Sequence, residues 1–506
     1  MDIFANLLPA ELAHHVPVLV VVIPLIAAAL AAIMPNGRAG WTVAIITASI
    51  VALFSLVLLA QALDLGVISY ALGGWAPPIG IEYRVDALNA VVLALVGLVG
   101  LLCVIYSLPS VADEIEEGKQ ALFYSAFLVC FAGLLGVTIT GDAFNVFVFL
   151  EISSISTYTI IAMGASKDRR ALTAAYNYLI LGTIGATFFV IGVGFLYAAT
   201  GTLNMADMAR ILQENGHDRV TEAAFAFIVV GLGLKAAMFP LHVWLPNAYA
   251  FAPNFVTAFL ASTATKVAFY ALIRFLFSVY HPDTAFVQMS FTWVFAVVGV
   301  IAMFVASAQA IFQTDARRLL AYSSVAQVGY MMLGLGMGTV LGLQAGILHL
   351  INHALMKGAL FMALGAFALN FGVRQVADLA GLGRTMPASA MAFTIAGLSL
   401  VGVPLTVGFD SKWYLILAAL ERDWWWAVAA LILSSLMALI YIGRMIMVVW
   451  MEPVPAHPGA EVKPRHAPYM MLIPTGIIAF ANIYFFFDAS LLVSLSGAAA
   501  QAVMGG

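Results

Sequence analysis

The segment HLINHALMKGALF, residues 349 to 361, carries three titratable side chains in a run that is otherwise apolar. His349, His353 and Lys357 are spaced by four residues, so they fall close to one face of an α-helix, which has 3.6 residues per turn. Histidine titrates near neutral pH, and removal from water makes a lysine lose its proton more readily. The spacing predicts a ladder of groups that can load and release protons.

The composition around this ladder predicts an all-α polytopic membrane protein. Of the 506 residues, 63% are hydrophobic and only 9% are charged, which is too little polar surface to cover a soluble globule of this size. The apolar segments run for about 20 residues without alternation, which favours helices over a barrel. A basic stripe for nucleic acid is missing from the sequence. Two cysteines in apolar segments, Cys103 and Cys130, offer neither a disulfide framework nor a thiolate cluster, so no cofactor is expected.

Hydropathy along the chain predicts about fourteen transmembrane helices. Their approximate ranges are 16–34, 41–63, 87–108, 121–140, 143–164, 171–200, 223–247, 254–280, 287–311, 318–336, 340–371, 388–420, 425–451 and 468–487. Gly, Pro and alternating apolar residues between the second and third segments indicate a small hairpin outside the membrane. The small residues after 489 are expected to lie at the interface or to be disordered.

Loop charges predict the orientation. Eleven basic residues follow odd-numbered segments: Arg38, Lys119, Lys167, Arg169, Arg170, Arg317, Arg318, Arg374, Arg384, Lys463 and Arg465. Four follow even-numbered segments: Arg84, Arg210, Arg219 and Arg422. The excess puts the odd-numbered loops in the cytoplasm and both termini outside.

Six basic residues fall inside predicted spans: Lys235, Lys266, Arg274, Lys357, Lys412 and Arg444. Glu151 is the only carboxylate near the middle of a span, and a lone charge at the bilayer centre costs about 2.5 to 3.5 kcal/mol on an insertion scale. Arg274 and Arg444 lie near span ends, where snorkelling or a buried pair explains them. Lys266 and Lys357 lie far from both ends of their spans, which favours a functional role.

Two spans are interrupted, and each interruption lies beside a lysine. Pro240 breaks GLGLKAAMFPLHVWLPNAYAFAP near Lys235, and SLVGVPLTVGFDSKW contains Gly and Pro before Lys412. Paired broken helices are typical of inverted-repeat transporters. Glu151 precedes Lys235 by 84 residues and Gln327 precedes Lys412 by 85, so a second repeat would hold Gln where the first holds Glu.

Five motifs resemble one known family. FNVFVFLEISSISTY, GLGLKAAMFPLHVWLPNAYAFAPNFVTAFLASTATKVAFYALIR, TDARRLLAYSSVAQVGYMMLG, HLINHALMKGALFMALG and GVPLTVGFDSK are similar, in this order, to the antiporter-like subunits of respiratory complex I, membrane-bound hydrogenases and Mrp cation/proton antiporters. Within the family, GDAFNVFVFLEI, GTLNMADMA and HLINHALMK most resemble the D-type subunits of Mrp antiporters.

The resemblance implies fourteen helices with two inverted five-helix repeats, helices 4–8 and 9–13, in which helices 7 and 12 are broken. We therefore expect N-terminal helices and the hairpin in 1–120, the first repeat in 121–280, the second through broken helix 12 in 287–422, and the last two helices with the tail in 423–506. The implied proton path consists of Glu151, Lys235, Lys266, His349, His353, Lys357 and Lys412.

Two of the three residues considered next, Asp410 and His242, have two interpretations each. Asp410 either pairs with Lys412 or contacts a transported cation, although relatives are apolar or small there. His242, just after Pro240, either caps the broken helix or takes part in transport. Asp142 is expected to cap the fifth span.

Two function classes remain open, with a scaffold that transports nothing as a third. The first is a subunit of a multisubunit Na⁺/H⁺ antiporter, a secondary transporter in the cell (inner) membrane that moves protons and monovalent cations. The second is a proton-pumping subunit of a redox enzyme such as complex I. Both require homologous antiporter-like subunits and small membrane subunits as partners within the lipid bilayer.

Overall fold

The computed structural model describes residues 4, 7–216, 218–288, 290–453 and 466–504. Within this part of the chain, 12 helices are long and apolar enough to cross a membrane. They are α2 (Ala10–Ala32), α3 (Gly37–Leu65), α4 (Ala87–Glu114), α5 (Gln120–Ile139), α6 (Ala143–Ala162), α7 (Arg170–Thr200), the helical span Asn254–Val279, α13 (Phe291–Phe312), α14 (Ala316–Gly336), α15 (Val340–Phe371), α19 (Trp425–Met451) and α20 (Tyr469–Phe487). The predicted all-α membrane class is confirmed.

The other two predicted spans are broken into helix pairs. The first pair is α9 (Arg219–Lys235) and α10 (Trp244–Phe251), and the second is α17 (Pro387–Val401) and α18 (Val407–Glu421). Both breaks lie where Pro and Gly predicted them. Each of the fourteen predicted segments thus corresponds to one of the twelve long helices or to a broken pair.

A third interruption, inside the span Asn254–Val279, was not predicted. The helix α11 (Asn254–Ser262) ends before Thr263, and α12 (Ala264–Ile273) then leads into the π-helical segment η4 (Arg274–Val279). Thr263 has φ −126° and ψ −57°, outside the helical range. No Pro or Gly lies at this point, so the sequence carries none of the usual signals of a break.

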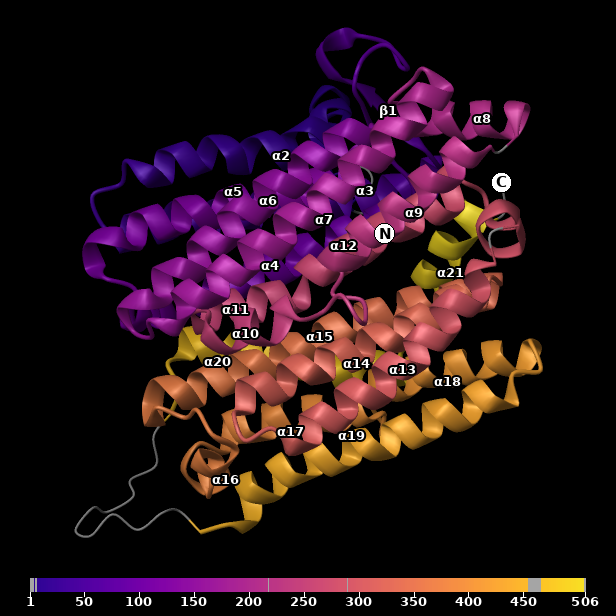
Figure 1. The fold of residues 1–506 in the computed structure, drawn as a ribbon. Helices are drawn as coiled ribbons and strands as arrows, with labels where there is room; N and C mark the ends of the chain where they lie inside the picture. Colours follow the sequence, from indigo (N-terminus) through magenta and orange to yellow (C-terminus); the bar gives the residue numbers. More distant parts are fainter. Residues whose placement is uncertain (1–3, 5–6, 217, 289, 454–465, 505–506) are drawn as a thin grey trace.

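The loops gather at two opposite ends of the bundle. Loops after odd-numbered segments contact each other, because Arg374 pairs with Asp168 at 3.0 Å and with Asp315 at 3.5 Å. Loops after even-numbered segments also meet, through bridges between Tyr83 and Thr140 and between Asp142 and Asn204. Successive spans therefore run in opposite directions (Figure 1).

The loops also hold short elements. These are the hairpin of β1 (Ile68–Ala71) and β2 (Glu82–Val85), the surface helix α8 (Met205–Asn215), the single turn α16 (Leu382–Thr385), the short segments η1 (Leu72–Gly74), η2 (Glu117–Lys119), η3 (Met163–Ser166), η5 (Asp283–Gln288) and η6 (Val376–Leu379), and the last helix α21 (Ser490–Met504). The hairpin was predicted. Of the two expectations for the last residues, disorder was wrong for Ser490–Met504, which is a helix.

The helix α21 packs in the bundle against α15 and α4. Its small residues allow close approach to neighbouring helices. Gln344 of α15 donates a hydrogen bond from Nε2 to the carbonyl oxygen of Val493 at 3.1 Å. The weak hydropathy of this segment therefore reflects packing against protein.

The helix α15 lies at the centre of the bundle. It packs against α14 and α18 on one side, α11 and α4 on another, and also against α17, α20 and α21. In Figure 1 it lies between the indigo and magenta helices of the first half and the orange and yellow helices of the second. The ladder predicted on this helix is therefore inside the protein.

Candidate functional site

Lys235 and Glu151 form the first part of the site. Lys235 is the last residue of α9, only 7% exposed, and its Nζ lies 3.7 Å from Glu151 Oε1. It also donates a hydrogen bond to Ser154 Oγ at 2.5 Å. Glu151 and Ser154 are three residues apart on α6, so they share a face of that helix. The predicted Glu–Lys pair is formed.

Lys412 lies on α18 but is held by the end of α17. Its Nζ donates to the carbonyl oxygens of Leu400 at 3.1 Å and Val401 at 2.8 Å, and to Ser435 Oγ of α19 at 3.0 Å. The last carbonyls of a helix have no partner within it and carry a partial negative charge. Gly402 has φ 87°, and a Cβ there would lie 2.7 Å from Lys412 Cδ, so the break and the lysine site need glycine at this position.

Lys266 comes directly after the unpredicted interruption and, like Lys412, binds the end of the preceding helix. Its Nζ donates to the carbonyl oxygen of Ala261, in the last turn of α11, and lies 3.4 Å from Thr265 Oγ1. Lys235 ends α9, so three lysines lie at the carboxyl ends of interrupted helices. Half-helix ends of this kind form ion sites in transporters.

The ladder on α15 is completely buried, and its predicted shared face is present. The rings of His349 and His353 are nearly parallel, with centroids 6.3 Å apart. Lys357 donates from Nζ to the carbonyl oxygen of Leu320 at 2.7 Å and to the hydroxyl of Ser323, both on α14. The charge of Lys266 on α12 acts on all three ladder residues.

The two histidines have different surroundings. His349 Nε2 lies 2.8 Å from Gln327 Oε1, and His349 Nδ1 lies 2.9 Å from Ser411 Oγ. Both ring nitrogens of His353 are buried with no hydrogen-bond partner among the described residues. His349 thus joins α14, α15 and α18, whereas His353 contacts its neighbours through ring faces.

Hydroxyl groups between Lys235 and Lys266 were missed from the sequence. Ser154 contacts Lys235 and the Tyr178 hydroxyl, while Thr265 beside Lys266 contacts the Tyr249 hydroxyl. Tyr178 and Tyr249 also interact with each other. Ser, Thr and Tyr are common in membrane helices, so only their proximity to the lysines distinguishes these residues.

Asp410, His242 and Asp142, which the sequence left outside the implied path, each have different surroundings. No ion pair between Asp410 and Lys412 is present in the described part of the chain, and on a helix two residues this far apart do not face each other. The His242 ring stacks on Phe239, with centroids 5.3 Å apart. Asp142 caps α6 as predicted, accepting from the Asn145 backbone N–H at 2.7 Å.

Arg444 binds the end of a neighbouring helix. It donates to the carbonyl oxygens of Ile311 at 2.8 Å and Gln313 at 2.6 Å, where α13 ends. These carbonyls have no partner in their own helix, so Arg444 has a structural role at the end of α13.

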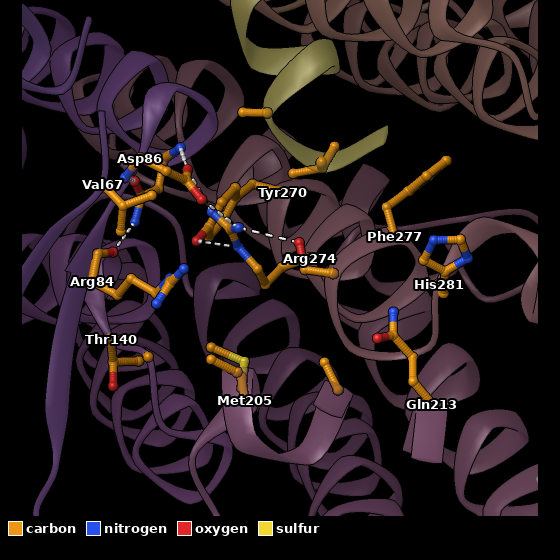
Figure 2. Close-up of a pocket in the computed structure, with 17 residues that line it drawn as sticks. Val67, Arg84, Asp86, Thr140, Met205, Gln213, Tyr270, Arg274, Phe277 and His281 are labelled. Carbon is orange, nitrogen blue, oxygen red and sulfur yellow. Dashed lines mark hydrogen bonds and ion pairs between the residues drawn. The ribbon is translucent and has the colours of Figure 1, made fainter. Parts of the chain in front are cut away.

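Arg274 forms a buried ion pair at the end of the bundle where the hairpin lies. Its guanidinium donates to both carboxylate oxygens of Asp86, at 2.7 and 2.8 Å. The pair borders a cavity of about 280 Å³ that is also lined by Arg84, Tyr270 and His281 (Figure 2). Burial alone would raise the pKa of Asp86, but the Arg274 charge and its hydrogen bonds lower it. The buried-pair interpretation of Arg274 is confirmed.

Comparison with known proteins decides the family. Residues 140–438 match the family model described as NADH:quinone oxidoreductase/Mrp antiporter, TM. The chain belongs to this family. The N-type subunit of an NADH-quinone oxidoreductase from Desulforudis audaxviator is 42% identical over 93% of this chain and 95% of its own length. The D-type subunit of a Na(+)/H(+) antiporter from Alkalihalophilus pseudofirmus is 33% identical over 71% of each chain.

The fold of this family member also matches a solved antiporter complex. A chain of the Mrp complex from Dietzia sp. DQ12-45-1b superimposes with a TM-score of 0.88, at 27% identity, over 97% of this chain and 98% of that one. The match therefore extends over nearly the whole bundle. As a member of the family, the chain has relatives named for antiport and relatives named for quinone reduction.

The Asp86–Arg274 pair generates a stability prediction. Asp86→Ala leaves Arg274 buried without a partner and removes the cap of α4, so we expect a loss of about 3 to 5 kcal/mol in unfolding free energy. Asp86→Asn keeps a capping oxygen and should cost less. Because the pKa of Asp86 is lowered, the stabilisation is present above about pH 3.9 and is lost as the pH falls from there through the lowered value. The unfolding free energy of each variant is measured by thermal unfolding of the purified complex.

Asp218→Ala is the matched control, because Asp218 also caps a helix, accepting from the Thr221 backbone N–H, but has no buried cation as a partner among the described residues. It should lower the unfolding temperature much less than Asp86→Ala. Equal losses for the two alanine variants would mean that the buried pair adds nothing beyond the cap.

Proposed function

We propose that this chain is the ion-translocating subunit of a multisubunit antiporter, which exchanges Na⁺ or another monovalent cation for protons. One observation carries the proposal: buried ionisable side chains extend through the bundle from the Glu151–Lys235 pair to Lys412. A buried charge without a partner is costly, and groups inside a membrane are typical of ion pathways. Several relatives are named as the D-type subunits of Na(+)/H(+) antiporters, which supports the choice of cation.

Proton movement along this path follows from the partners of each group. A carboxylate close to a buried lysine favours its charged form, and withdrawal of that carboxylate favours the neutral amine. Movement of Glu151 relative to Lys235 would thus release a proton toward Lys266. Lys266 would pass it to the ladder of His353, Lys357 and His349, and Lys412 would release it. Because these sites interact, they titrate as a group.

We place the two inverted repeats in helices 4–8 and 9–13, within residues 121–280 and 287–422. The repeats would supply one half-channel each, the first controlled by Glu151 and the second ending at Lys412. Gln327 takes the position that Glu151 has in the first repeat. Asp410, beside Lys412, is a candidate contact for the transported cation because its carboxylate forms no ion pair within the described residues.

A redox-driven proton pump is the second candidate. It is favoured by the 42% identity to a relative named as a subunit of NADH-quinone oxidoreductase. The same path would serve both functions, with the driving force supplied by different partner subunits. In the antiporter the chain is a secondary transporter subunit, whereas in the pump it is part of an enzyme.

The first prediction that follows from this proposal tests the proton path. Lys235→Ala, Lys357→Ala and Lys412→Ala each remove a carrier, so we expect transport to fall about ten-fold or more, while the amount of assembled complex changes little. Cation-dependent proton flux in membrane vesicles is measured beside immunodetected complex. Lys119→Ala is the control, since the Lys119 side chain is 59% exposed and pairs with Glu116 at the surface. Normal flux in Lys235→Ala at normal abundance would exclude the proposed path.

The second prediction concerns orientation, with odd-numbered loops in the cytoplasm and both termini outside. A cysteine introduced at Arg169 should react with a membrane-impermeant thiol reagent only in inside-out vesicles. One introduced at Trp75, which is 68% exposed on the hairpin loop, should react only in right-side-out vesicles. The opposite labelling pattern would reverse the orientation.

The third prediction separates the two functions. Purification of the complex through a tag on this chain should recover small membrane subunits and a homologous antiporter-like subunit, and the isolated chain should exchange few ions. Recovery of quinone-binding and iron–sulfur subunits would instead identify the redox pump. Strong Na⁺-dependent proton flux from the reconstituted chain alone would contradict the need for partners.

A further inference from the structure

His349 has two hydrogen-bond partners. The carbonyl oxygen of Gln327 can only accept a hydrogen bond, whereas the hydroxyl of Ser411 can donate or accept one. The carbonyl oxygen of an amide has no proton to give, so the 2.8 Å contact with Gln327 Oε1 puts a proton on His349 Nε2. In the neutral ring, Nδ1 is then an acceptor, and the Ser411 hydroxyl at 2.9 Å donates to it. The neutral state therefore satisfies both ring nitrogens.

The protonated state requires only that one hydroxyl turns. When a proton arrives at Nδ1, that nitrogen becomes a donor and Ser411 Oγ must accept from it. The hydroxyl proton remains on Ser411 and needs another acceptor. The Gly408 carbonyl oxygen lies 3.4 Å from Ser411 Oγ and can take this role. The ring gains one proton, and no covalent bond to hydrogen in His349 or Ser411 is broken.

Gly408 transmits this change to the break between α17 and α18. Its backbone N–H lies 3.2 Å from Ser399 Oγ, and a Cβ on Gly408 would collide with the Ser399 carbonyl oxygen. The next two carbonyls of α17, those of Leu400 and Val401, hold Lys412. A change in the hydrogen bonds of Gly408 therefore acts on the helix end that binds this lysine.

The cations that face His349 oppose its protonation, so the protonated ring depends on its hydrogen bonds for stability. The ionisable groups that face it are His353 on its own helix, Tyr330 from α14, Lys412 from α18 and Lys266 from α12. No carboxylate forms an ion pair with His349 in the described part of the chain. Gln327 is a neutral acceptor, so the charged ring has hydrogen-bond partners but no permanent counter-ion there.

We infer that Ser411 is a positioning residue through which protonation of His349 acts on the helix end that holds Lys412. The inference rests on the proposed proton path. It assigns to a serine a role that neither its type nor its spacing indicates. Coupling arises because Ser411 belongs to the broken helix and His349 to the continuous one.

The test compares substitutions that act on the charged ring in opposite ways. Ser411→Ala removes the acceptor for Nδ1–H, so transport should slow about ten-fold or more, as for loss of one hydrogen bond to a charged group, and its half-maximal pH should move down. Gln327→Glu supplies a counter-ion, so the half-maximal pH should move up. Ser411→Thr keeps the hydroxyl and should keep the wild-type profile. Cation-dependent proton flux over a range of pH, in vesicles with the complete complex, measures all three.

Controls separate this inference from the path itself. Ser55→Ala removes an equally buried hydroxyl that donates to its own helix α3, at Ala52, and should leave the pH profile unchanged. Ser411→Cys is nearly isosteric and accepts hydrogen bonds weakly, so it replaces Ser411→Ala should that variant fail to assemble. An unchanged pH profile in Ser411→Ala or Ser411→Cys, with transport lost in Lys412→Ala, would overturn the role of Ser411 alone. Normal transport in Lys412→Ala would overturn the path.

Discussion

A helix that ends inside a membrane leaves its last carbonyl oxygens without partners, and lipid supplies no water to satisfy them. In this protein lysines take the place of that water. Lys412 binds the carbonyls that end α17, and Lys266 binds a carbonyl that ends α11. The interruption and the charge stabilise each other, because each alone would be costly in an apolar medium. The proposed proton path depends on this exchange of partners.

Carbonyl oxygens differ from carboxylates as partners for a lysine. A carbonyl carries only a partial charge and accepts a hydrogen bond from an ammonium or from a neutral amine, so it favours the charged lysine less strongly than a carboxylate does. Among the lysines of the path, as far as the described residues show, Lys235 alone pairs with a carboxylate, Glu151, and this carboxylate is partly exposed. In the proposed proton path, control by a full charge would thereby be confined to one end, and the other end would use the neutral groups around His349.

The Asp86–Arg274 pair shows the contrasting use of buried charge. Arginine does not lose its proton in proteins, and both oxygens of Asp86 are engaged by it, so the pair is permanent. It joins the start of α4 to η4, on the span that carries Lys266. We interpret it as a fixed support beside exchangeable groups. The permanent ion pair and the lysines of the proposed path thus differ in residue type and in partner.

The sequence by itself determined the membrane class, the span positions, the breaks near Pro240 and Gly402, and the ladder on one helix face. These features depend on local composition and on helical period, which neighbouring residues encode. The break at Thr263, the partner of Arg274 and the packing of α21 could not be derived, because each depends on residues distant in the chain. Tertiary structure alone brought Gln327 and Ser411 to His349, since only folding places three helices around one ring.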